Sequence, residues 1–121
     1  MIETLIYTVL TADADIKARV NTRIYPVRIP QNPVYPAITY YRASAGVVNT
    51  LAGYSGKKNP TIIINAFART YAEVKDMAKE LLTAMDGART FRAILTWEDD
   101  DYNDDLNLYA ISQEYSCWGS E

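Results

Sequence analysis

The eight residues from Glu98 to Asp105 carry six carboxylates, and they are the part of the chain that could bind a divalent cation. Asp101, Asn103 and Asp105 occupy alternate positions, as the first ligands of a calcium loop do when Asp101 is counted as its first position. Such a loop also needs Gly at its sixth position and Glu at its twelfth, where this chain has Leu106 and Ser112. A hydrolytic carboxylate pair would need a walled cleft that raises one pKa. The run is therefore interpreted as a solvated loop.

Other catalytic chemistry finds little support in the residue types. Residues 53–58, Gly-Tyr-Ser-Gly-Lys-Lys, have the wrong glycine spacing for a phosphate loop, and a predicted strand follows where a helix is required. The chain has no histidine, which excludes Ser-His-Asp and Cys-His nucleophiles and histidine-ligated zinc. Its single cysteine, Cys117, lies in an apolar strand pattern and is predicted to be an inert core thiol. The sequence therefore predicts no enzyme activity, no metal and no cofactor.

The length of 121 residues predicts a single domain over residues 1–121. Three helices are predicted within it. Apolar residues at helical spacing predict a first helix from Ile2 to Leu10, and Thr11 is interpreted as the N-cap of a short second helix that ends at Asn21. A capping box that starts at Thr70 begins the clearest helix, which ends at Gly87. Its regularly spaced methionines are interpreted as core packing.

Alternation of apolar and polar residues predicts four strands, at Ala37–Ala45, Pro60–Arg69, Thr90–Trp97 and Leu106–Trp118. The resulting order, α-α-β-β-α-β-β, predicts an α+β fold with a mostly antiparallel four-stranded sheet, one long helix packed on a face and an N-terminal helical segment. Four prolines between Thr22 and Pro36 predict an extended, edge-like segment. Residues Gly46–Asn59 are predicted to form a long loop, either functional or disordered.

Charge is segregated along the chain, although the net charge is only −3. Eight cations and no acid lie from Lys17 to Arg69, whereas eight acids and no base lie from Glu98 to the end. A subunit with a positive side and a negative side would bind head to tail, and such contacts close into rings or continue as fibres. Folding could equally bring the two segments onto one surface, where they would cancel. The scattered cations do not favour a specific DNA reader.

Composition also bears on location and partners. The first residues lack the basic start and apolar core of a signal peptide, and no apolar run approaches the roughly 20 residues that span a bilayer. The sequence therefore predicts a soluble protein that is intracellular when synthesised. Its ten tyrosines suit both half-buried strands and protein interfaces.

Several short segments carry a family resemblance through their order and spacing: Thr11-Ala12-Asp13, Thr22 to Pro26, Pro36 to Tyr40, Leu51 to Gly56, Ile62 to Ala68, Thr70 to Lys75, Leu106 to Tyr109 and Tyr115 to Trp118. Together they resemble the small tail-completion, or tail-terminator, proteins of long-tailed bacteriophages, which join the tail tube to the head. The resemblance runs from about Leu5 to Trp118. One departure is the turn after the acidic run, which reads Asn103-Asp104-Asp105 where the family usually has Glu and Gly.

The resemblance implies a virion structural protein without catalytic or cofactor residues. Members form rings, of about six subunits, on the head-proximal end of the tail tube. The ring ends tube growth and presents a surface to the head connector, and DNA passes through its lumen without sequence-specific binding. The protein would be located in the virion tail after assembly in the host cytoplasm, with no membrane partner.

A mechanism follows from the resemblance and the charge pattern together. The loop Gly46–Asn59 would reach towards the tail-tube ring or the lumen, with Leu51 and Tyr54 as anchors and Lys57 and Lys58 as steering charges. Neighbouring subunits would pair basic with acidic residues, namely Arg23, Arg28 and Arg42 with Asp99, Asp100, Asp101, Asp104 and Asp105. Two alternatives remain open: a soluble dimeric binding module with a Tyr-rich sheet, and a hydrolase that uses the acidic loop.

Overall fold

The computed structural model of the chain describes residues 2–31, 33–44, 47–50, 53–88 and 91–118, of which 2, 47–50 and 53–58 are described by their backbone only. Within these residues lie three helices and seven strands, in the order α1 (Ile2–Ala12), α2 (Ala14–Val20), β1 (Ile24–Pro26), β2 (Ala37–Ser44), β3 (Val47–Thr50), β4 (Gly53–Lys58), β5 (Thr61–Ala68), α3 (Tyr71–Asp86), β6 (Arg92–Asn103) and β7 (Leu108–Trp118). No helix among them combines the length and the apolar character needed to cross a membrane.

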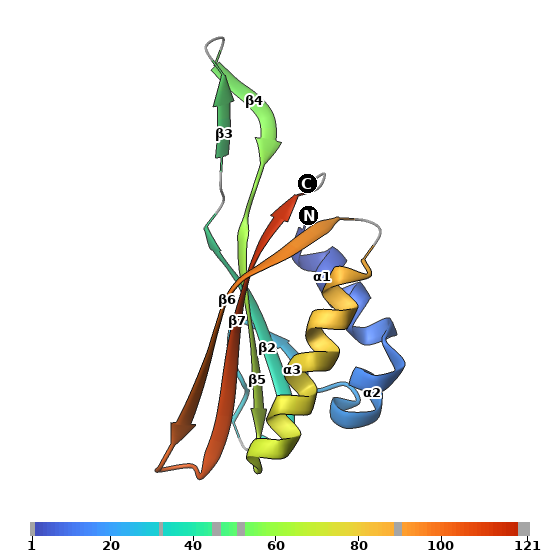
Figure 1. The fold of residues 1–121 in the computed structure, drawn as a ribbon, viewed down its shortest axis with the longest axis vertical. Coiled ribbons are helices and arrows are strands. Elements are labelled where there is room, and N and C mark those ends of the chain that lie inside the picture. The colour runs from blue at the N-terminus through green and yellow to red at the C-terminus, as the bar shows by residue number, and fades with distance from the viewer. Residues whose placement is uncertain (1, 32, 45–46, 51–52, 89–90, 119–121) are drawn as a thin grey trace.

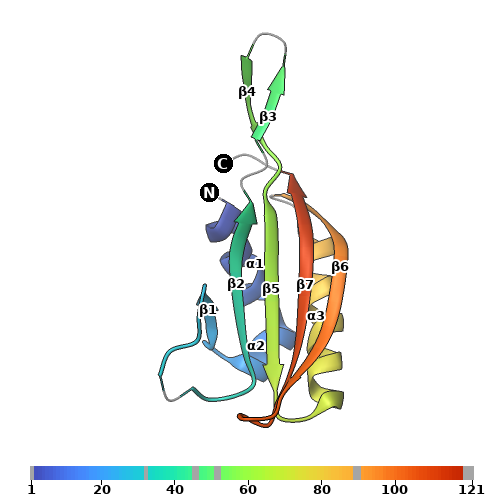
Figure 2. The ribbon, with the colours of Figure 1, turned by 90° about the vertical axis from the view of Figure 1, so that its left-hand side faces the viewer.

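Five strands form the main sheet, in the order β1-β2-β5-β7-β6 (Figure 2). Neighbours pair antiparallel, apart from β1, which runs parallel to β2. The predicted α+β class, with a mostly antiparallel sheet and a long helix on one face, is confirmed. The sequence predicts only four of these strands, because the fifth, β1, has three residues and opens the proline-rich segment. The Val27 amide still donates to the Tyr40 carbonyl of β2, and the positive φ of Val27 then turns the chain away from the strand direction.

The prediction of a long loop at 46–59 is wrong, because most of this segment forms the hairpin β3–β4. Its two strands pair from Val47 with Lys58 to Thr50 with Gly53. The hairpin extends past the end of the main sheet, as Figure 1 shows. The sequence does not indicate this hairpin, because residues 51–52 between the strands are Leu-Ala and not the Asn-Gly or Asp-Gly that is typical of a tight hairpin.

The prediction of an acidic loop is also wrong, because β6 continues through the acids to Asn103 and pairs with β7 along its whole length. The turn is confined to residues 104–107, where the Asn103 side chain accepts a hydrogen bond from the Leu106 amide and Asn107 has a φ of 52°. Aspartate disfavours strands, but β6 is an edge strand whose carboxylates reach water, so pairing with β7 overrides the local preference.

The helix ends agree with the sequence at Asn21, Thr70 and Gly87, and they differ at the N-cap of α2. Thr70 caps α3 by accepting a hydrogen bond from the Glu73 amide, as predicted, and Asn21 has the positive φ expected of a helix stop. The N-cap of α2 is Asp13 and not Thr11, whose hydroxyl donates to a carbonyl inside α1. The Asp13 carboxylate accepts from two amides of the first turn, which a threonine in a preceding helix cannot do.

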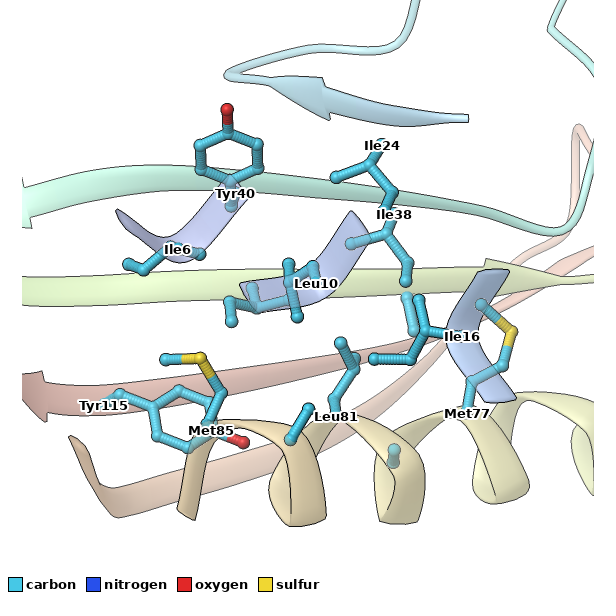
Figure 3. Packing of buried hydrophobic residues seen from close by; sticks show 14 of the residues in the cluster. Ile6, Leu10, Ile16, Ile24, Ile38, Tyr40, Met77, Leu81, Met85 and Tyr115 are labelled. Carbon is cyan, nitrogen blue, oxygen red and sulfur yellow. The ribbon is translucent and has the colours of Figure 1, made fainter. Parts of the chain in front are cut away.

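The core lies between one face of the sheet and the helices, and Figure 3 shows part of it. Helix α3 supplies six buried residues, which include both Met77 and Met85, so the methionines pack in the core as predicted. The sheet supplies the alternate residues that face them, among them Ile38, Ile62, Ile64, Ala66, Ile111, Tyr115 and Cys117. No described helix covers the opposite face of the sheet, which Figure 2 presents to the viewer. Half-buried residues of β5 such as Ile63 and Phe67 lie on this open face.

Candidate assembly interfaces

The basic half of the chain is partly neutralised by its own fold. Arg19 in α2 donates to Glu80 of α3 over 2.7 Å and lies within 4 Å of Glu73 and Asp76 on the same helix. These contacts join α2 to α3 and remove Arg19 from the charges available to a partner.

The three predicted basic contact residues lie in different settings. Arg23 is half-buried, and its guanidinium donates to the carbonyls of Pro36 and Arg19, so it serves packing within the chain. Arg28 is exposed in the segment after β1, and no salt bridge joins it to a described carboxylate. Arg42 is exposed towards the end of β2, where it pairs with Ile62 in the sheet register. Arg28 is therefore the basic side chain best placed for a partner.

The acidic residues alternate between the two faces of β6. Asp99 and Asp101 pair with half-buried β7 residues and lie on the open face. Asp100 lies on the helix side, where the Tyr71 hydroxyl donates to it over 2.6 Å and the Lys75 ammonium lies 3.1 Å away. The hydrogen bond from Tyr71, and then Lys75, hold the pKa of Asp100 below its ordinary value of 3.8. Asp100 therefore fastens β6 to α3.

The turn and the edge leave other acids for a partner. Asp104 and Asp105 are both exposed in the turn between β6 and β7. Beyond β6 the sheet has no further described strand, so its outer backbone edge is open over 12 residues. At the other side of the sheet, β1 has only three residues. The two sheet edges thus differ in length. They also differ in charge, because β6 contains four carboxylates in succession whereas the segment after β1 contains Arg28.

The predicted partner loop corresponds to the projecting hairpin. Tyr54, Lys57 and Lys58 lie in β4, of which only the backbone is described, and Leu51 lies outside the described residues. Because the hairpin extends beyond the main sheet, it can reach a neighbouring molecule without moving the core (Figures 1 and 2).

A pocket of about 350 Å³ opens on the uncovered sheet face, and nothing in the sequence pattern indicates it. Its floor includes Asn65 and Phe67 of β5, and Asn65 donates to the Thr39 hydroxyl while accepting from Ser112. Its walls are the segment after β1, the end of β6 and the turn before β7, which contribute Val27, Arg28, Ile29, Tyr35, Asp101, Asn103 and Leu106. Among its described lining residues Tyr35 is the one tyrosine.

Reactive groups are few in the described part of the chain. No three His, Cys, Asp or Glu side chains there come together as a possible metal site. Cys117 is fully buried, and burial raises the pKa of its thiol to about 11. The thiol is therefore protonated at neutral pH and shielded from reagents, as expected for a core residue.

Comparisons with known proteins identify the relatives of the chain. A family model described as "Tail completion protein gp17" matches residues 4–119, which confirms the resemblance indicated by the sequence segments. Among solved structures, a chain of the "Virion of native gene transfer agent (GTA) particle" has a TM-score of 0.70 and 18% sequence identity, over 93% of this chain and 90% of that chain. At this identity the likeness concerns the fold. No curated protein matches the sequence.

Proposed function

The chain belongs to the family of the tail completion protein gp17, and we propose that it is a virion structural protein that forms a ring at the head-proximal end of a phage tail tube. The ring ends tube growth and joins the tail to the head connector. It comprises about six subunits, and DNA passes through its lumen without sequence-specific binding. The protein acts by assembly, with no catalysis and no cofactor, and it is located in the virion tail after assembly in the host cytoplasm.

The observation that carries this proposal is the difference between the two edges of the sheet. The open edge at β6 is long and acidic, whereas the opposite edge at β1 is short and is followed by Arg28. Two β6 edges paired antiparallel would place carboxylates opposite carboxylates, which is unfavourable. A β6 edge beside the basic edge of the next copy is favourable, and repetition of such a head-to-tail contact closes a ring.

The hairpin supplies the contact with the tail. We assign Leu51 and Tyr54 as apolar anchors and Lys57 and Lys58 as steering charges towards the tail-tube ring or the lumen. The segment 47–58 contains two lysines and no acid, so it favours an acidic surface on its partner. The head connector then binds the ring on another face.

One observation favours the alternative of a soluble dimeric binding module, namely the pocket on the open face. Its volume of about 350 Å³ lies at the lower limit of ligand pockets, which start at roughly 300 Å³. Such a module would form a small fixed oligomer and would bind no tail tubes, so the oligomeric state separates the two functions.

The test is absolute mass by light scattering across protein concentration, with negative-stain imaging of large species and with purified tail tubes added. We expect closed rings, formed alone or on tubes, that dissociate between about 0.05 and 1 M salt because the screening length falls several-fold. Asp99→Lys should prevent ring formation, and Asp99→Lys with Arg28→Glu should restore it. The matched control is Lys17→Glu, which reverses an exposed charge in α2, outside both edge strands.

Each outcome decides between the functions. A stable dimer that ignores tubes would refute the ring and support the binding module. Rings that persist in 1 M salt and in the Asp99→Lys variant would refute contact through charge and point to apolar contacts, for which Trp97 is a candidate with 50% exposure.

A further inference from the structure

Val27 has a backbone conformation that is rare for its residue type. Its φ is 68°, and the amide of Arg28 donates to the carbonyl of Pro26 over 2.8 Å, which closes a γ-turn around it. The form of the γ-turn with positive φ is rare and strained, and a β-branched side chain makes it worse. The Val27 amide donates to the Tyr40 carbonyl over 2.9 Å, so strand β2 holds the residue in this conformation.

The strain brings no packing within the chain. The Val27 side chain is 69% exposed, so it gains little from burial in the isolated subunit. Glycine would adopt the same φ without strain and would expose no apolar surface. A strained residue with an exposed apolar side chain is expected where that side chain meets a partner.

Residues from two segments lie around Val27 on the open face of the sheet. Arg28 is exposed beside it, and Leu106 from the turn before β7, 53% exposed, lines the same pocket. Arg69 contacts both segments that line this pocket. Its guanidinium donates to the Leu106 carbonyl over 2.8 Å and lies 5.0 Å from the centre of the Tyr35 ring. Arg69 thereby joins the turn to the proline-rich segment.

The β6 edge of the same chain carries a matching pair of residues. Trp97 and Asp99 are two positions apart in β6, and the register pairs both with residues on the open-face side of β7. Trp97 is 50% exposed, and Asp99 is exposed. The segment after β1 therefore presents an aliphatic side chain followed by a cation, Val27 and Arg28. The β6 edge presents an aromatic ring and a carboxylate, Trp97 and Asp99.

We infer that the γ-turn is a subunit contact, in which Val27 of one copy packs on Trp97 of the next while Arg28 pairs with Asp99. This inference rests on the proposed ring and adds the residues of its contact. The partner is a second copy because the charges match. Pro26 faces away from β2 and has no N–H to donate to a further strand at this edge. Contact at the β1 edge must therefore use side chains, and the γ-turn turns Val27 outward for this purpose.

The decisive variant is Val27→Gly, because it affects folding and assembly in opposite directions. Relief of the strain should raise the melting temperature of the subunit by about 4 °C or more. Loss of the buried valine should weaken each subunit contact by about tenfold or more, measured by light scattering against concentration. The shift of Trp97 fluorescence on assembly should be lost as well. The control is Val34→Gly, which removes another exposed valine of the same segment, 60% exposed, that has no positive φ.

A second measurement identifies the partner directly. Arg28→Cys with Asp99→Cys in one chain should give a ladder of disulfide-linked oligomers on oxidation, and neither single variant should. If the parent protein forms rings but Val27→Gly assembles normally, this contact is overturned and the proposed function stays intact. The same holds if the parent forms rings but the double cysteine variant gives no ladder. An unchanged melting temperature of Val27→Gly would overturn the strain. Absence of rings and of the ladder, even on tail tubes, would overturn both.

Discussion

A buried polar network around Gln113 gives the sharpest prediction for stability. The Gln113 side chain in β7 is 1% exposed, and its amide donates to the Ala78 carbonyl over 2.9 Å and to the Glu98 carboxylate over 2.8 Å. Its carbonyl oxygen accepts from the Tyr115 hydroxyl over 2.6 Å. Burial, and then the charge of Glu98, raise the pKa of Tyr115, so this hydroxyl stays protonated and must donate. The network thus joins the edge strand, its neighbour and α3.

The free energies follow from which polar groups lose their partners. Gln113→Leu leaves the Tyr115 hydroxyl, which is fully buried, without its acceptor, and should destabilise the subunit by about 2–3 kcal/mol. Tyr115→Phe leaves the Gln113 oxygen without a donor and should cost about 1–2 kcal/mol. The double variant removes both partners of the Tyr115–Gln113 bond at nearly constant volume. Only the Ala78 carbonyl and the exposed Glu98 carboxylate then lose a donor, so it should cost about 1 kcal/mol. For a domain of this size the first variant lowers the melting temperature by roughly 10 °C.

The assay is urea unfolding of dilute subunits in 1 M salt, so that assembly does not add to the measured stability. The control is Tyr109→Phe, the same chemical change at a half-buried site of β7, which should change stability by less than about 0.5 kcal/mol. Additive effects of Gln113→Leu and Tyr115→Phe would refute the coupling. Stability of Gln113→Leu within about 0.5 kcal/mol of the parent would refute the network as a whole.

Two further predictions concern the hairpin and pH. Leu51→Asp with Tyr54→Asp should leave the melting temperature unchanged and abolish attachment to tail tubes in a pelleting assay, whereas normal tails with this variant would remove the hairpin from the mechanism. Because Tyr71 and Lys75 lower the pKa of Asp100, its contribution to stability is present above its ordinary pKa and is lost as pH falls below about 4. Asp100→Asn should therefore have a lower melting temperature than the parent at pH 7, and this difference should shrink as the pH falls below 3.8. A difference that stays constant down to pH 2 would contradict this reasoning.

Local signals in the sequence determined the elements with strong periodicity. The capping threonine and the apolar stripe of α3 were sufficient to predict that helix, since both effects act within one or two turns. The alternating residues of β5 and β7 predicted two central strands, because both are buried on one face. The family resemblance likewise followed from the order of short segments. The absence of histidine restricted the possible chemistry through composition alone.

Only the tertiary structure decided the features that depend on distant partners. Strand β6 runs through a series of aspartates because β7 pairs with it, and the hairpin β3–β4 forms without a typical turn signal. Folding also decided which charges remain for assembly, since α3 neutralises Arg19 and holds Asp100 while Arg28 stays exposed. The strain at Val27 arises from its bond to β2, which no local pattern reveals. Sequence therefore determined local conformation, and long-range pairing determined the surfaces.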